Sequence, residues 1–217
     1  MVAILKKAGV SFAVMPEERC HAEVGRRLGE EYLYQTVQHE NVEAMKQYKF
    51  RKVITHCPHC FNTIKNEFPQ FGGTYEVLHH SVVINELIES GRIRPIKPLD
   101  ATVVFHDSCY LGRYNGIMQA PRKAMAAVPG LKVIDPPRAQ ERGLCCGGGG
   151  GHMWMEVPSE KRVNVIRTEE LMQTGASIVG TACPFCLAMV DLGRKVKGAE
   201  ETLAVKDVSE LIADSLQ

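Results

Sequence analysis

The stretch Ile178-Val179-Gly180-Thr181, which runs into Cys183-Pro184-Phe185-Cys186, indicates the fold class. Its first four residues favour a short strand because they are rich in β-branched side chains, and a turn follows. Proline suits the first turn of a helix, since its missing N–H costs nothing there and its φ is already helical. The stretch therefore predicts a strand, a turn that carries two thiols, and a helix.

The same arrangement occurs earlier, where Val53-Ile54-Thr55 runs into Cys57-Pro58-His59-Cys60. Strand and helix alternate around both turns, which favours an α/β fold with mainly parallel sheets. We expect two pseudo-repeated Rossmann-like units, the first of them incomplete. Strands are expected at 75–78, 102–105 and 202–205, and helices at 24–48 (with one break), 81–89, 160–173 and 209–216.

The domain boundaries follow from the repeat. Residues 1–92 form the incomplete first unit, 93–98 an exposed linker with two prolines and alternating charges, and 99–217 the complete second unit. The second unit has a leading cysteine 37 positions before Cys146, but the same offset from Cys20 falls before Met1. Either the sequence is truncated or this repeat has been reduced.

Composition narrows the class of function. The chain has 217 residues, is 45% hydrophobic and carries a formal net charge of +1, which argues against nucleic acid as the main partner. No apolar run approaches the roughly 20 residues of a membrane span, and Lys6-Lys7 interrupt the only candidate signal sequence. We expect a cytoplasmic location, which allows peripheral attachment to the inner face of the cytoplasmic membrane. Disulfides are rare there, so eight cysteines indicate metal or redox chemistry.

All eight cysteines fall into two sets. In the second unit, 35 residues separate the first cysteine from an adjacent pair, and 36 more separate that pair from the Cys-x-x-Cys turn. Soft thiolates of this kind select iron–sulfur clusters, zinc or copper. Since ligand sites of open α/β sheets form at the carboxyl ends of strands, we expect these thiols to converge. The first thiol set is Cys20, Cys57 and Cys60, and the second thiol set is Cys109, Cys145, Cys146, Cys183 and Cys186.

Five glycines follow the cysteine pair. Two neighbouring thiolates bind different irons of one cluster only where the backbone bends sharply, and Gly147 and Gly148 permit that bend and leave space for a cofactor. A phosphate-binding loop is not supported, because the third glycine of G-x-G-x-x-G would be His152 or Met153. A structural zinc or a cubane cluster takes four ligands, so a fifth thiolate is either spare or belongs to an unusual cluster.

Other polar and aromatic residues carry weaker signals. His106 and Asp107 lie beside Cys109, where they would donate a proton or a hydrogen bond to the cluster, or else only satisfy the loop backbone. His79-His80 favours a cap or surface role over metal ligation, and Trp154 favours a place in the core.

The pattern Cys109-x35-Cys145-Cys146-Gly147-x35-Cys183-x2-Cys186 resembles the CCG domain, and the resemblance covers nearly the whole chain. That domain occurs twice in the B and D subunits of heterodisulfide reductases. It also occurs in iron–sulfur subunits of glycolate and lactate oxidation systems. The segments 55–63, 79–80 and 106–115 resemble the membrane-associated branch thought to pass electrons from electron-transfer flavoprotein to quinone.

The resemblance implies a noncubane [4Fe–4S] cluster held by the second thiol set. It implies an electron-transfer subunit or domain of a heterodisulfide-reductase-like oxidoreductase, not active alone, between a flavoprotein or ferredoxin donor and a disulfide or quinone acceptor. The implied partners are other redox subunits: a flavoprotein, a ferredoxin-like subunit or a membrane quinone-reactive subunit. The alternatives are a zinc-stabilised scaffold without redox activity and a truncated, inactive fragment.

The first repeat departs from the family pattern, because Arg19-Cys20 stands where a cysteine pair would be. Its three thiols leave three alternatives open: a cubane cluster with one open iron, a zinc with one histidine, or no metal. The histidines near these thiols in sequence are His21, His56 and His59.

Overall fold

The computed structural model describes residues 1–158 and 161–216, and within them two parallel sheets form. The larger sheet has the order β4-β3-β5-β6, and the smaller one pairs β1 with β2. All four strand pairs are parallel, which confirms the expected α/β class. The strands are β1 (Val53–Thr55), β2 (Val77–His79), β3 (Ala101–Phe105), β4 (Leu131–Ile134), β5 (Ile178–Thr181) and β6 (Ala204–Asp207).

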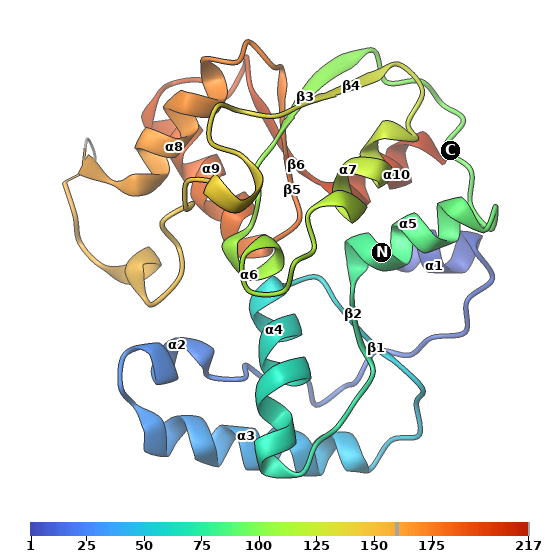
Figure 1. Ribbon diagram of the computed structural model, residues 1–217, viewed down its shortest axis with the longest axis vertical. Coiled ribbons are helices and arrows are strands. Elements are labelled where there is room, and N and C mark those ends of the chain that lie inside the picture. Colours follow the sequence, from blue (N-terminus) through green and yellow to red (C-terminus); the bar gives the residue numbers. More distant parts are fainter. Residues whose placement is uncertain (159–160, 217) are drawn as a thin grey trace.

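Helices cover both faces of the larger sheet (Figure 1). Successive side chains of a strand point to opposite faces. Accordingly, Val104 of β3 packs in one cluster with Leu171 and Val190 from the helices α8 and α9, whereas Val103 and Phe105 face the other cluster. The helices of the second half are α6 (Cys109–Gly112), α7 (Gln119–Ala126), α8 (Val163–Met172), α9 (Pro184–Val196) and α10 (Val208–Ser215), with short 3₁₀ turns at Gln140–Arg142 and His152–Trp154.

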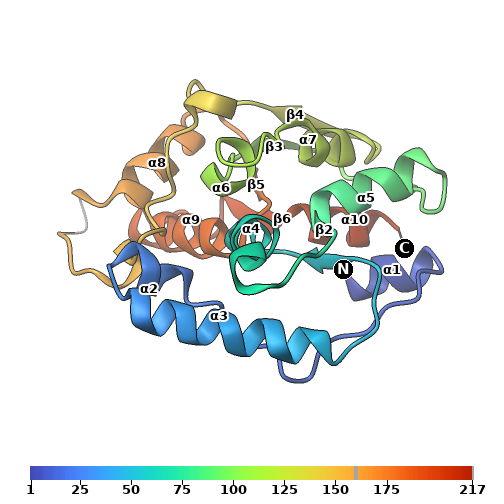
Figure 2. The ribbon, with the colours of Figure 1, turned by 60° about the horizontal axis from the view of Figure 1, so that its bottom comes forward.

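The first half lies mostly at the other end of the molecule, around α3 and α4 (Figures 1 and 2). The expected break in helix 24–48 is confirmed, and Gly29 with φ +92° stands in the gap. The helices of this half are α1 (Val2–Lys7), α2 (Glu23–Arg27), α3 (Glu31–Lys46), α4 (Pro58–Asn62), which continues into a π-helix at Thr63–Glu67 and a 3₁₀ turn at Phe68–Phe71, and α5 (His80–Glu89).

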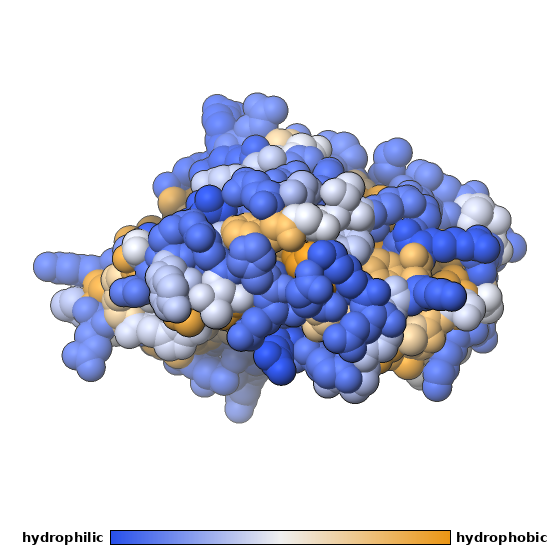
Figure 3. All heavy atoms as spheres, turned by 90° about the horizontal axis from the view of Figure 1, so that it is seen from below, coloured by the Kyte–Doolittle hydropathy of each residue, from blue (hydrophilic) through white to orange (hydrophobic). Residues whose placement is uncertain are grey.

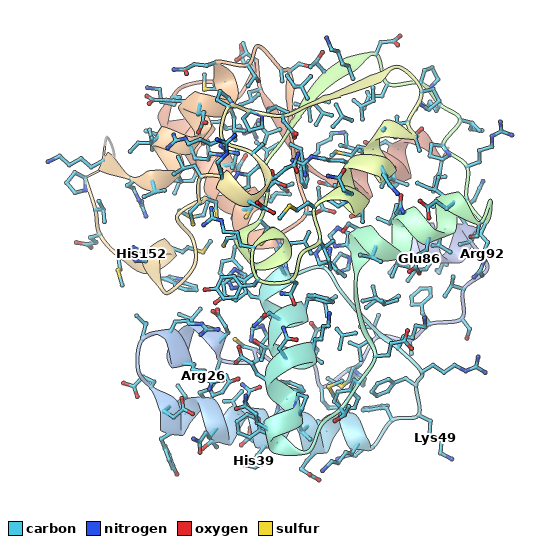
Figure 4. All side chains as sticks on the ribbon, viewed as in Figure 1. Arg26, His39, Lys49, Glu86, Arg92 and His152 are labelled. Carbon is cyan, nitrogen blue, oxygen red and sulfur yellow. The ribbon has the colours of Figure 1, made fainter. Side chains whose placement is uncertain are left out.

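The two halves share one hydrophobic core. Ile4 of α1 and Ile84 of α5 belong to the same buried cluster as Val103 of the large sheet. Arg92, at the end of α5, donates two hydrogen bonds to the carbonyl of Ala8 just after α1, 2.7 and 3.1 Å long (Figure 4). Since α1 and α5 complete the core of the second half, the predicted unit boundaries do not correspond to two separate cores.

Some expectations about exposure and boundaries were wrong. The segment 93–98 is only partly exposed, because Ile93 is 3% exposed and packs into the shared core. Trp154 is 64% exposed and meets Phe185 edge to face instead of entering the core. Of the helix expected at 160–173, residue 160 lies outside the described residues, and the rest forms α8. The sequence pattern did not predict α1, α7 or β4.

The outer surface near α2 and α3 is largely hydrophilic, with apolar patches between the charged side chains (Figure 3). Leu28, just after α2, and Tyr32 and Leu33 of α3 are exposed apolar residues of this region. No helix among the described residues is both long and apolar enough to cross a membrane.

One buried carboxylate ties the halves together. Asp207 ends β6 and caps α10, where its side chain accepts from the Ser209 N–H at 2.8 Å and Glu210 completes a capping box. The same carboxylate oxygen accepts a 3.0 Å hydrogen bond from Nε2 of His80, the first residue of α5. His79 caps α5, which confirms one of the two roles expected for this pair, although both histidines are buried.

We predict that Asp207→Asn destabilises the protein at pH 7 and does so progressively less as the pH falls below about 4. Burial raises the pKa of Asp207, but the hydrogen bond and charge of His80 and the bonds from Ser209 outweigh burial and hold it below its ordinary value. A carboxyl group with a lowered folded-state pKa contributes stability above its unfolded pKa and loses it as the pH drops. Denaturant unfolding at a series of pH values measures this.

Asp207→Ala should cost about 0.5–2 kcal/mol further at neutral pH, because it also removes the helix cap. The control is Asp214→Asn, which breaks only an exposed pair with Lys206 and should change stability little. An Asp207→Asn loss of equal size at pH 3 and pH 7 would contradict an ionised, hydrogen-bonded carboxylate at this position.

Candidate metal centre

The strand ends place the cysteines. Cys57 follows β1 and precedes α4, and Cys183 follows β5 and precedes α9, each as an extended N-cap with proline next. Cys109 begins α6, four residues after the end of β3. The carboxyl ends of β3 and β5 are neighbours because these strands pair directly. The turn chemistry expected from the sequence is therefore present at both Cys-x-x-Cys sites.

The structure brings the second thiol set together. The Sγ atoms of Cys186 and Cys146 are 3.4 Å apart, and both thiols are buried. Cys183 pairs with Cys186, and Cys145 pairs with both Cys146 and Cys109. The five sulfur atoms therefore form one continuous row, and no disulfide joins any of the eight cysteines of the chain, all of which the structure describes.

The first thiol set joins the end of this row. The Cys57 thiol is a hydrogen-bond neighbour of Cys60 and of Cys183, so the two sets touch. Nε2 of His21 lies 2.9 Å from Sγ of Cys60. Cys20 is exposed, and its sulfur accepts a 3.4 Å hydrogen bond from the Ala22 N–H.

Of the three histidines near the first thiol set in sequence, only His21 makes a hydrogen bond to a thiol within the described part of the chain. Nδ1 of His59 lies 3.1 Å from a carboxylate oxygen of Glu23. The ring of His56 lies against that of His80, with their centroids 5.1 Å apart. His21 is thus the best placed of the three to join the thiols around a metal.

Crowding of buried thiols separates their pKa values. Hydrogen bonds from Cys109 and Cys146 lower the pKa of Cys145 to about 2, and the bond to Cys145 raises that of Cys146 to about 12. In the other half of the row, hydrogen bonds from Cys183 and Cys60 lower the pKa of Cys57 to about 2. The row therefore favours one thiolate in each set with protonated neighbours, and a bound cation would displace the remaining protons.

A buried carboxylate supports the junction between the two sets. Glu23 is 1% exposed and accepts hydrogen bonds from the Tyr110 hydroxyl at 2.7 Å and from Arg27 Nε at 3.0 Å. Burial raises its pKa, but bonds from His59, Tyr110 and Arg27 outweigh burial and lower it to about 2. The His59 ring stacks on Tyr110 at a centroid distance of 4.1 Å. Sequence reasoning missed Glu23 and Tyr110, because nothing in the cysteine spacing marks them.

The glycine run closes over the second thiol set. Gly147 has φ +79°, and a side chain there would lie 3.1 Å from Cβ of Val163. Its N–H donates to Sγ of Cys145 at 3.2 Å. A side chain at Gly148 would lie 3.0 Å from Met189 and 3.6 Å from the Cys146 sulfur. The loop then passes over α2, where Figure 4 shows His152.

His106 and Asp107 separate into different roles. A ring nitrogen of His106, which is fully buried, lies within 4.8 Å of the sulfur atoms of Cys146 and Cys186. Burial, and next the charge of Arg167, lower the pKa of His106 to about 3, so the ring is neutral. Asp107 instead forms two bonds to Arg122, 2.7 and 2.8 Å long, and accepts from the Gln140 N–H at 2.7 Å. Only His106 faces the thiols.

These residues fit a metal cluster. The donor atoms are soft, contiguous and mostly buried, and a backbone N–H already points at one sulfur. Five thiols in one row exceed the four ligands of a closed tetrahedral zinc site.

Comparison with known proteins places this site in context. The cysteine-rich CCG domain family matches residues 1–65 and 103–191. A probable iron–sulfur-binding oxidoreductase of Bacillus subtilis, FadF, is 43% identical over 214 residues, which is 98% of this chain and 30% of that protein. The EtfAB:quinone oxidoreductase of Syntrophomonas wolfei is 42% identical, over 100% of this chain and 31% of that protein.

A more distant relative belongs to the dihydromethanophenazine:CoB–CoM heterodisulfide reductase of Methanosarcina barkeri, as its D polypeptide. It is 31% identical over 220 residues, which is 98% of this chain and 53% of that protein. The chain thus spans about a third of the length of the first two relatives and about half of the third.

We predict that Gly147→Ala weakens metal binding and lowers stability by about 1–2 kcal/mol, because a Cβ is strained at positive φ. The matched control is Gly149→Ala in the same run. Gly149 lacks a positive φ, and a side chain there would meet His59 at an ordinary 3.5 Å. Bound metal per chain and denaturant unfolding measure the two variants. Equal effects in both would contradict a specific role for the bend at Gly147.

Proposed function

The chain belongs to the CCG family of cysteine-rich domains, and on this basis we propose that its second thiol set holds a [4Fe–4S] cluster of the noncubane type. The observation that carries the proposal is the continuous row of five thiols, with Cys146 and Cys186 in contact at 3.4 Å. Such a cluster supplies one-electron chemistry when bound. The ligands would be Cys109, Cys145, Cys146, Cys183 and Cys186.

The function that follows is electron transfer within a heterodisulfide-reductase-like oxidoreductase. Electrons would arrive from a flavoprotein or ferredoxin donor and leave to a disulfide or quinone acceptor. The names of the relatives support this, since they include an iron–sulfur-binding oxidoreductase, an EtfAB:quinone oxidoreductase and a component of a heterodisulfide reductase. We propose a component that needs other subunits for turnover, located in the cytoplasm or peripherally at the inner face of the membrane.

The protein's own residues hold and insulate the site. The Gly147 N–H and the bend at Gly147 and Gly148 would orient the cysteine pair. Burial of Cys146, Cys183 and Cys186 excludes water from the sulfur atoms. The Asp107–Arg122 pair fixes the loop after β3, which carries both His106 and Cys109.

A zinc-stabilised scaffold is the second candidate function, and the first thiol set favours it. Cys57, Cys60 and the more exposed Cys20, with His21 2.9 Å from Cys60, offer three sulfur donors and one nitrogen donor. That set suits a tetrahedral zinc or a cluster with one nitrogen ligand. Because Cys57 neighbours Cys183, metals in both sets would lie close together.

Anaerobic purification followed by iron, zinc and sulfide analysis tests the proposal. The wild-type chain should contain about four irons in the second set, as a [4Fe–4S] cluster requires. Cys146→Ser should remove most of this iron, because Cys146 lies in the middle of the row. Cys20→Ser is the control, since it changes only the first set and should leave the second-set iron in place.

Two results would contradict the assignment. Zinc without iron in the wild-type protein would favour the scaffold in place of electron transfer. Equal loss of iron in Cys146→Ser and Cys20→Ser would mean that the second set does not hold a cluster of its own.

A further inference from the structure

Among the described residues, His106, Cys146 and Cys186 form a buried group whose ligand atoms lie within 4.8 Å of one another. By composition this group resembles a metal-binding triad. A histidine that ligates a metal normally donates its other ring N–H to a carboxylate, a carbonyl or a water. The partner of the other ring nitrogen therefore decides whether His106 is a ligand.

That partner is a guanidinium. Nε of Arg167, on α8, lies 3.0 Å from Nδ1 of His106. Arginine has five N–H donors and no acceptor, so Nδ1 must accept this hydrogen bond. A neutral imidazole has one donor and one acceptor nitrogen, so its single proton must lie on Nε2. Nε2 is buried and has no hydrogen-bond partner within the described residues.

We propose that Arg167 locks His106 in its Nε2–H form, so that His106 donates a hydrogen bond to sulfur at Cys146–Cys186 and is not a metal ligand. Arg167 is then a positioning residue that acts through His106. The consequence for reduction potential rests on the proposed function, because hydrogen bonds to the sulfur atoms of a cluster help set its potential. Donors and positive charge beside the cluster favour the reduced, more negative form.

The surroundings of Arg167 hold it in place for this role. Its side chain is fully buried, and Nη1 donates to Glu170 Oε2 and to the Arg138 carbonyl, both at 3.0 Å. The Arg138 side chain, half-exposed, pairs with the same carboxylate at 3.0 Å. Burial of a large cation with a single carboxylate partner is unfavourable unless its donors are used. The bond to His106 uses the donor that faces the thiols.

The tautomer is measured directly in the full-length chain without metal. Long-range ¹H–¹⁵N correlation spectra of reduced protein labelled with ¹⁵N-histidine distinguish the two neutral forms and the imidazolium, and His106→Gln assigns the signal. We expect His106 as the neutral Nε2–H form. An Nδ1–H form or an imidazolium in the wild-type protein would overturn the proposal, and this result needs no variant to fold.

Two neutral replacements separate the hydrogen bond from the charge. Arg167→Gln keeps an amide donor for Nδ1 and should keep the Nε2–H form, whereas Arg167→Met has no donor and should lose that preference. Arg138→Gln is the control, because it removes a charge from the same Glu170 without contact to His106. An unchanged tautomer in Arg167→Met would contradict the lock.

In the iron-loaded chain, His106→Leu should shift the midpoint potential downward. Pulsed paramagnetic resonance of the ¹⁵N-histidine wild type should show a weakly coupled, exchangeable proton and no directly bound nitrogen. A bound nitrogen, or an unchanged potential in His106→Leu, would overturn the proposal. Absence of iron from the wild-type chain would instead count against the proposed function, since the tautomer is decided without metal.

Discussion

The crowding of buried thiols at the carboxyl ends of the strands is the constraint on which the rest of this structure depends. Parallel strands bring the loops after β1, β3 and β5 toward one region, and the sulfur row runs through it. Adjacent buried thiols cannot all ionise, because each added negative charge raises the pKa of its neighbours. The pKa values near 2 for Cys57 and Cys145, beside strongly raised neighbours, express this competition. A multivalent metal core would relieve it.

The protein surrounds that row with donors and balanced charge. The Gly147 N–H points at Cys145, and the neutral ring of His106 faces Cys146 and Cys186. On the other side, Glu23 is offset by Arg27 and by bonds from His59 and Tyr110. Unpaired charge is thus kept away from the sulfur atoms, which suits a centre whose own charge changes.

The sequence predicted the parts that local pattern controls. Strands β1 and β5, the proline that begins each following helix, and the convergence of the thiols follow from short-range signals and parallel-sheet topology. The resemblance to the CCG domain supplied the cluster hypothesis, which spacing alone left open. Contacts between distant segments could not be predicted: Arg167 and His106 are 61 positions apart, and Tyr110 and Glu23 are 87 apart. In sequence, a buried arginine or glutamate is indistinguishable from a solvated one until its partners are known.

The same limit explains the error at Ile93, since a proline-rich segment is typical of a linker unless one of its side chains fits a neighbouring core. A flexible hinge at 93–98 would leave the contact between the two thiol sets variable. Instead, α1 and α5 pack into the core of the second half, and buried bonds from His80 to Asp207 and from Tyr110 to Glu23 cross between the halves. Such contacts are rigid on the scale of a close-packed interior. The spacing between the two sets is therefore a property of the shared core, and centres held in both sets would keep a fixed separation.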